Sequence, residues 1–66
     1  MDRLKEFRKG KGLSQDAMAR KIGVSLSMYE KVETGRAHTS SAFMARVKKA
    51  FPDANIDSIF FAAQQQ

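Results

Sequence analysis

Cysteine and tryptophan are absent from this 66-residue chain, and proline and histidine each occur once. Without cysteine the chain can form no disulfide and no thiolate metal site, so a reducing compartment suits it. No apolar run approaches the ~20 residues that a membrane-spanning helix needs, and residues 1–11 are too charged for a signal peptide. These absences predict a cytoplasmic protein with no membrane segment.

The residue groups of a catalytic or metal site are also missing. The single histidine, His38, has no second ligand at a suitable spacing, and the carboxylates are scattered along the chain. No glycine-rich phosphate loop is present either. We therefore expect no enzyme activity, no metal and no cofactor.

What the chain does have is positive charge. Twelve Lys and Arg residues against seven Asp and Glu residues give a net charge of +5 and an isoelectric point near 10. This balance suits a polyanionic partner, because each phosphate that a cationic side chain neutralises releases condensed counterions. Charge by itself does not identify the partner, since the basic residues are spread along the chain and Lys48 and Lys49 can simply complement a helix dipole.

Residues 15–34 contain two short amphipathic stretches with the spacing of a helix-turn-helix. Ala19 is small, as a close crossing of two helices requires. Gly23 follows the first helix, where the backbone usually turns through a positive φ that glycine adopts without a Cβ penalty. Ser25 can cap the second helix, and Val24 is expected between the two.

The second helix of this motif has an inner and an outer side. Successive residues lie about 100° apart around a helix, so Tyr29 and Val32 share the inner side. In a helix-turn-helix the second helix lies in the DNA major groove. The candidates for DNA base readout are Leu26, Ser27, Glu30 and Lys31.

Each of these candidates also has a plainer interpretation. Leu26 can contact a thymine methyl or pack at the helix edge, and Ser27 can pair with several bases. Glu30 can accept from cytosine N4 or form an ion pair. Lys31 can donate to guanine, approach a phosphate or remain solvated.

The stretch LSQDAMARKIGVSLSMYEKVETGR resembles the XRE-type family of small Cro- and repressor-like regulators. The similarity covers about residues 3–60 and includes the initial LSQ, the IGVS turn and the closing ETGR. The family implies an all-α, compact five-helix lambda-repressor-like domain that binds double-stranded operator DNA, usually as a homodimer on a pseudo-palindromic site. The chain departs from the family at Leu26 and Ser27, where Gln, Arg or Asn is common.

The resemblance also implies contacts outside the second helix of the motif. Arg8 and Glu33 match positions that commonly form a partly buried ion pair with an orienting role; the alternative is two solvated residues. The first turn of the helix that starts near Gln15 favours an anion. His38 has the alternative of being merely solvated. The implied phosphate contacts are Gln15, Thr34, Arg36 and His38.

The residues outside the motif are expected to form a scaffold. The whole chain, residues 1–66, is expected to be a single domain, because so short a chain buries only about 60% of the surface that its unfolded form exposes and can build only one core. Asp2 can cap a first helix that runs to about Lys11, and Gly12 follows it. The glutamine-rich end, residues 62–66, is expected to be disordered.

Two further helices follow the motif. A fourth helix starts at Ser40 or Ser41 and stops before Pro52, and Asn55 can cap a short fifth helix. The basic residues expected to point outward from the fourth helix are Arg46, Lys48 and Lys49.

Phe61 bears on the oligomeric state. It lies outside the apolar face of the fifth helix, and an exposed phenylalanine beside other apolar residues indicates a contact surface. In the family the C-terminal helices commonly form the twofold interface. We therefore expect Phe61 at a dimer interface, with folding back over the core as the alternative.

These observations predict a sequence-specific DNA-binding transcriptional regulator, most simply a repressor. The competing hypothesis is a protein-interaction module of the antitoxin or antirepressor-target type that keeps the fold. It rests on the apolar start of the second helix of the motif, at Leu26 and Met28.

Overall fold

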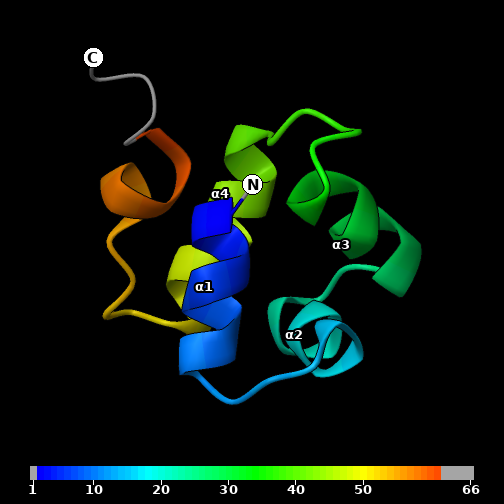
Figure 1. Ribbon diagram of the computed structural model, residues 1–66. Coiled ribbons are helices and arrows are strands. Elements are labelled where there is room, and N and C mark those ends of the chain that lie inside the picture. Colours follow the sequence, from blue (N-terminus) through cyan, green and yellow to red (C-terminus); the bar gives the residue numbers. More distant parts are fainter. Residues whose placement is uncertain (1, 62–66) are drawn as a thin grey trace.

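The computed structural model describes residues 2–61, which form five helices and no strand (Figure 1). The helices are, in chain order, α1 (Asp2–Gly10), α2 (Gln15–Ile22), α3 (Leu26–Glu33), α4 (Ser41–Ala50) and the short π-helix η1 (Asp57–Phe61). The all-α, five-helix fold that the sequence predicts is thereby confirmed. The expected disordered end, residues 62–66, lies outside the described residues.

Serine residues define the starts of the three central helices. Ser14, Ser25 and Ser40 are the N-caps of α2, α3 and α4, and each hydroxyl accepts the backbone N–H three residues later at 3.0–3.1 Å. These bonds satisfy N–H groups that have no partner inside the helix. The choice between Ser40 and Ser41 is thus settled in favour of Ser40 as the cap.

The first helix differs slightly from its prediction. Asp2 is the first helical residue rather than its cap, and α1 ends at Gly10, one residue before Lys11. Gly12 has a φ of 72°, and its N–H bonds the carbonyl of Lys9 at 2.9 Å, which turns the chain toward α2. Leu13 follows and packs half-buried against the core.

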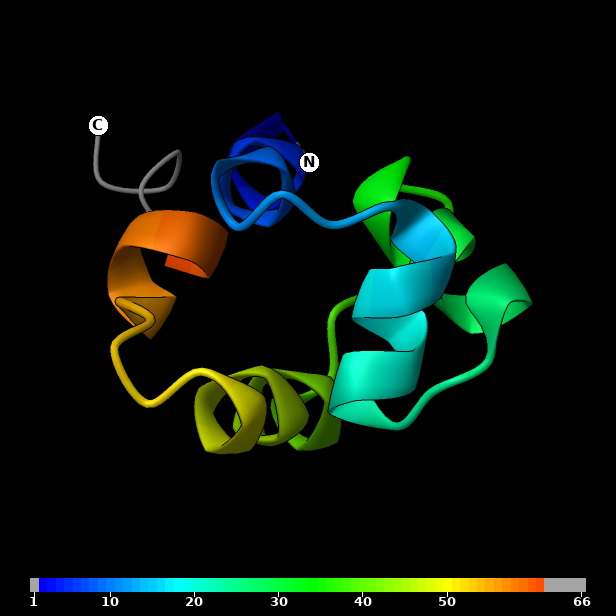
Figure 2. The ribbon, with the colours of Figure 1, turned by 90° about the horizontal axis from the view of Figure 1, so that it is seen from below.

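The five helices surround a common centre (Figure 2), and their buried side chains form one hydrophobic core. Rings from different elements meet in it: Phe7 of α1 contacts Phe51 edge-on at a centroid distance of 5.3 Å, and Phe43 of α4 contacts Phe60 at 6.3 Å. The core residues are Leu4, Met18, Ala19, Ile22, Tyr29, Val32, Phe43, Val47, Phe51, Ala54, Ile59 and Phe60.

The crossing of α2 and α3 follows the predicted motif. Ala19 is 1% exposed, and its carbonyl accepts the N–H groups of Gly23 at 2.9 Å and Val24 at 3.0 Å. Gly23 has a φ of 83°, the left-handed conformation expected of it, and Val24 packs half-buried against the core. Together these contacts place α3 at one edge of the molecule, visible on the right of Figure 1.

Candidate nucleic-acid interface

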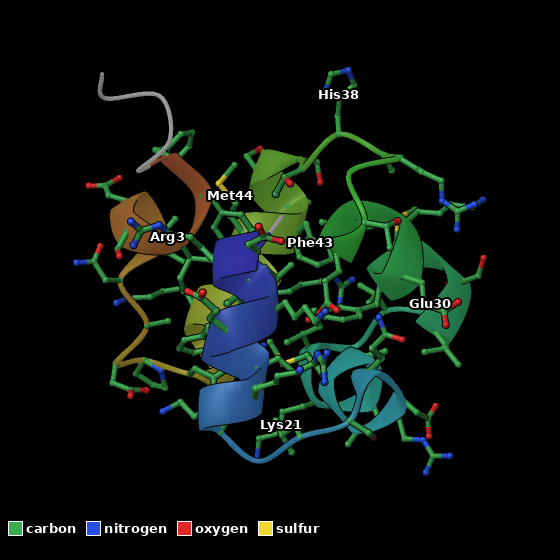
Figure 3. All side chains as sticks on the ribbon, in the orientation of Figure 1. Arg3, Lys21, Glu30, His38, Phe43 and Met44 are labelled. Atoms are coloured by element: carbon green, nitrogen blue, oxygen red, sulfur yellow. The ribbon has the colours of Figure 1, made fainter. Side chains whose placement is uncertain are left out.

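The outer side of α3 faces solvent. Ser27 and Lys31 are exposed and Glu30 is half-buried, whereas Tyr29 and Val32 are fully covered. Figure 3 shows the Glu30 side chain pointing away from the body of the protein. Among residues 2–61, the side chains of Ser27, Glu30 and Lys31 form no hydrogen bond or ion pair with the protein, so their polar groups are available to a partner.

The start of α3 presents apolar surface. Leu26 is 38% exposed and Met28 is 45% exposed. Both side chains therefore stand beside the polar groups of α3. Residue type alone does not decide between core and surface for Met28, because methionine fills gaps in cores and also occurs at contact surfaces.

A buried carboxylate at the end of α3 joins three helices. Arg8 of α1 donates to Glu33 twice, from Nε to Oε2 at 2.9 Å and from Nη2 to Oε1 at 3.1 Å. Both residues are buried, with exposed fractions of 8% and 6%. The structure thus contains the ion pair that the resemblance implies. Arg8 Nη1 also donates to the carbonyl of Leu13 at 2.8 Å, which ties the α1–α2 loop to the same group.

Two more donors reach Glu33. The hydroxyl of Tyr29 donates to Oε2, and Gln15 Nε2 donates to Oε1 at 3.0 Å. Burial alone would raise the pKa of Glu33, but the hydrogen bonds from Arg8 and the other donors outweigh it and lower the pKa. Burial, and then the bond to Glu33, raise the pKa of the Tyr29 hydroxyl. The cluster is therefore an ionised carboxylate with a full set of donors.

The predicted phosphate contacts lie at two places beside α3. Gln15 and Thr34 line one open groove, together with residues of α1. Arg36 lies beyond α3, where its Nε approaches Thr34 Oγ1 at 3.4 Å. His38 is exposed farther along this loop and points away from the protein (Figure 3). The structure brings the first three together and leaves His38 apart.

The hydroxyl of Thr34 already has a partner. It donates to the carbonyl of Glu30 at 2.7 Å, and the Thr34 N–H bonds the same carbonyl at 3.0 Å. To donate to a phosphate, the Thr34 hydroxyl would have to give up its hydrogen bond to the Glu30 carbonyl. Gln15 is less constrained, since its amide nitrogen has two hydrogens and Glu33 takes one.

Arg46 is exposed on α4, in line with its expected outward direction, and it also makes a contact that the spacing did not predict. Its guanidinium lies against the α2–α3 turn, where Nη1 donates to the carbonyls of Ile22 at 3.4 Å and Gly23 at 3.2 Å. Lys48 likewise turns back and donates to Pro52 and Ala54 carbonyls, both at 2.8 Å. Both side chains bond carbonyls that a helix or turn leaves unpaired.

Phe61 is half-buried at the end of η1 and packs against the core. Its neighbour Phe60 is 8% exposed and belongs to the core itself. A dimer contact by Phe61 would use only the part of its ring that remains accessible.

Residues 2–61 include no helix that is long and apolar enough to cross a membrane. Within the same residues, no three His, Cys, Asp or Glu side chains are grouped closely enough to hold a metal ion.

Comparison with known proteins identifies the family. A family model described as helix-turn-helix matches residues 4–52, from the first turn of α1 to just past α4. Searches of the curated proteins and of the solved structures gave no significant match. The matched range contains the capped helices, the glycine turn and the exposed side of α3. The chain belongs to the XRE-type helix-turn-helix family of DNA-binding regulators.

Proposed function

We propose that the protein is a sequence-specific transcriptional repressor that occupies a pseudo-palindromic operator with α3 in the major groove. The observation that carries this proposal is the outer side of α3, where three polar side chains that bond no other side chain or backbone group of residues 2–61 stand on a helix fixed by its cap and by the core. Such a rigid helix can hold side chains against base edges without a large cost in ordering.

The polar residues of α3 match the chemistry of base edges. Lys31 can donate to guanine O6 or N7, and Glu30 can accept from the amino group of cytosine N4. Ser27 can form a hydrogen bond with either guanine or cytosine, and Leu26 can make an apolar contact with a thymine methyl. Gln15 and Arg36 then fix the position of the protein by holding phosphates on either side of the groove.

The proposed active form is a homodimer. A twofold axis near the C-terminal helix would place two copies of α3 about 34 Å apart, one turn of DNA. The accessible part of Phe61 supports this site of contact. The positive net charge supports binding to the backbone, and the proposed place of action is the cytoplasm.

In-vitro selection from a random duplex library at about physiological salt tests the proposal. We expect enrichment of an inverted repeat with half-sites about one helical turn apart. If the protein retained DNA without enriching any motif, the binding would be driven by charge alone, and sequence-specific repression would be refuted.

A second candidate function is favoured by one observation, the exposure of Leu26 and Met28. In this alternative the start of α3 binds a protein partner, as an antitoxin or an antirepressor target does. It requires that a purified partner lose affinity for a Leu26→Ser/Met28→Ser variant while selection yields no DNA motif. An enriched DNA motif whose selection is abolished by changes at Glu30 or Lys31 would count against it.

A further inference from the structure

We propose that Lys5 and Lys9 of α1 bind the DNA backbone, so that the footprint of the protein extends beyond the helix-turn-helix onto α1. The proposal rests on the proposed function, because it takes DNA as the ligand. It adds two contacts that neither the sequence pattern nor the family resemblance assigns here.

The site is an open groove of about 590 Å³ between α1 and the adjoining ends of α2 and α3. One wall is α1, and the opposite wall is the start of α2 and the end of α3; Figure 2 shows these segments on the same side of the molecule. The residues that line it are Asp2, Lys5, Arg8, Lys9, Gln15, Glu33 and Thr34. The groove therefore joins α1 to two positions already proposed as phosphate contacts.

The free charge in the groove is positive. Arg8 and Glu33 neutralise each other within their ion pair. In the described part of the chain, the side chains of Lys5 and Lys9 take part in no ion pair or hydrogen bond, and Asp2 is the remaining acidic residue of the lining. Two unpaired cations against one carboxylate leave the groove attractive to an anion.

The two lysines are placed to act together. They are four residues apart on α1, so they lie on one face of the helix, and both are exposed. Their long flexible stems can follow a backbone phosphate without changing the helix. The Asp2 side chain, one turn before Lys5, sits at the far end of the same face and sets the limit of the attractive surface.

The opposite wall supplies hydrogen-bond donors to the same anion. The second amide hydrogen of Gln15 is not used by Glu33, and Gln15 lies in the first turn of α2, where backbone N–H groups and the helix dipole favour negative charge. A phosphate in the groove would thus meet cations from α1 and oriented N–H groups from α2.

The salt dependence of binding to a random-sequence duplex tests the proposal. Each phosphate contact contributes about 0.9 to the slope of log affinity against log salt. The Lys5→Gln/Lys9→Gln variant should therefore bind with a slope lower by about 1.8 than the parent. The loss of affinity should be the same for every duplex sequence, because phosphates carry no sequence information.

An Arg3→Gln/Lys49→Gln variant is the matched control. It removes the same charge from α1 and α4, but neither residue lines the groove, and Figure 3 shows Arg3 directed toward η1. We expect its slope to stay within about 0.5 of the parent. Equal slopes for the two double variants, or an affinity loss confined to one sequence, would overturn the proposal.

The outcome is separable from that of the proposed function. If selection yields no motif but random-duplex binding still depends on Lys5 and Lys9, the groove proposal stands and sequence-specific repression fails. If selection yields a motif and the two double variants behave alike, the groove proposal alone fails. If the parent retains no duplex at all, both are refuted.

Discussion

Arg46 on α4 holds the carbonyl of Gly23, donating to it from Nη1 at 3.2 Å across the turn that joins α2 to α3. A Cβ on Gly23 would lie 2.8 Å from this nitrogen, and the φ of 83° at Gly23 is one that other residues adopt only at a cost. The position of α3 therefore depends on a helix that does not itself belong to the motif.

Replacing Gly23 tests this bracing. Gly23→Ala should lower the free energy of unfolding by about 1–2 kcal/mol, because alanine is strained at this φ and its Cβ displaces Arg46. Urea unfolding measures the change. Gly10→Ala is the control: Gly10 is helical with open space around it, so this change should be neutral or stabilising by up to ~1 kcal/mol. Equal stability for the two variants would contradict the role of the turn.

The cluster around Glu33 predicts a larger effect. Glu33→Gln keeps the shape of the side chain but leaves the buried guanidinium of Arg8 without its carboxylate. We expect a loss of about 3–5 kcal/mol in the free energy of unfolding at neutral pH, measured by urea denaturation. A loss below about 1 kcal/mol would show that water or another carboxylate replaces the pair.

The same variant reports the pH dependence. The pKa of Glu33 is lower in the folded protein than in the unfolded chain. Its stabilising contribution is therefore complete above the ordinary carboxyl pKa and is lost as the pH falls through the lowered pKa. The difference in the free energy of unfolding between the parent and the Glu33→Gln variant should be constant near neutral pH and should become smaller below about pH 4. A constant gap down to acid unfolding would contradict an ionised Glu33.

Lys31 and Arg36 should affect DNA binding in different ways. Arg36→Ala should weaken binding to all sequences and reduce the salt slope by about one phosphate contact. Lys31→Ala should change the preferred sequence with little effect on the slope if Lys31 contacts a base. Selection and salt titration on both variants measure the two effects. The same change of slope with both variants, and no change of preference, would assign both side chains to the backbone.

Phe61 should govern self-association. Phe61→Ser should shift the protein toward monomer in analytical ultracentrifugation if the accessible part of the ring meets a second copy. Because Phe61 also packs against the core, the thermal midpoint is recorded alongside the mass. A folded variant with unchanged mass would place the dimer contact elsewhere.

The local features of this fold are visible in the sequence because neighbouring residues determine them. Ser14, Ser25 and Ser40 cap helices through N–H groups only three residues away, and Gly23 ends α2 by its own backbone conformation. Pro52 follows the end of α4 for the same kind of local reason. Helix boundaries could therefore be predicted to within a residue or two.

The contacts that complete the candidate site are not local. Gln15 meets Glu33 eighteen residues away, and Arg46 meets Gly23 at a separation of twenty-three. Such pairs depend on the angles at which helices pack, which residue spacing does not encode. The groove at Lys5 and Lys9 is similar: the spacing shows two lysines on one face of α1, but only the packing of α1 shows which segments they face.

Because the Arg8–Glu33 pair is buried, DNA binding and the stability of the fold should respond differently to ionic strength. Mobile ions screen charges at the surface strongly and buried pairs much less. Salt that releases the protein from DNA should therefore leave the junction of α1, α2 and α3 intact, and the eluted protein should be ready to bind again once the salt is diluted.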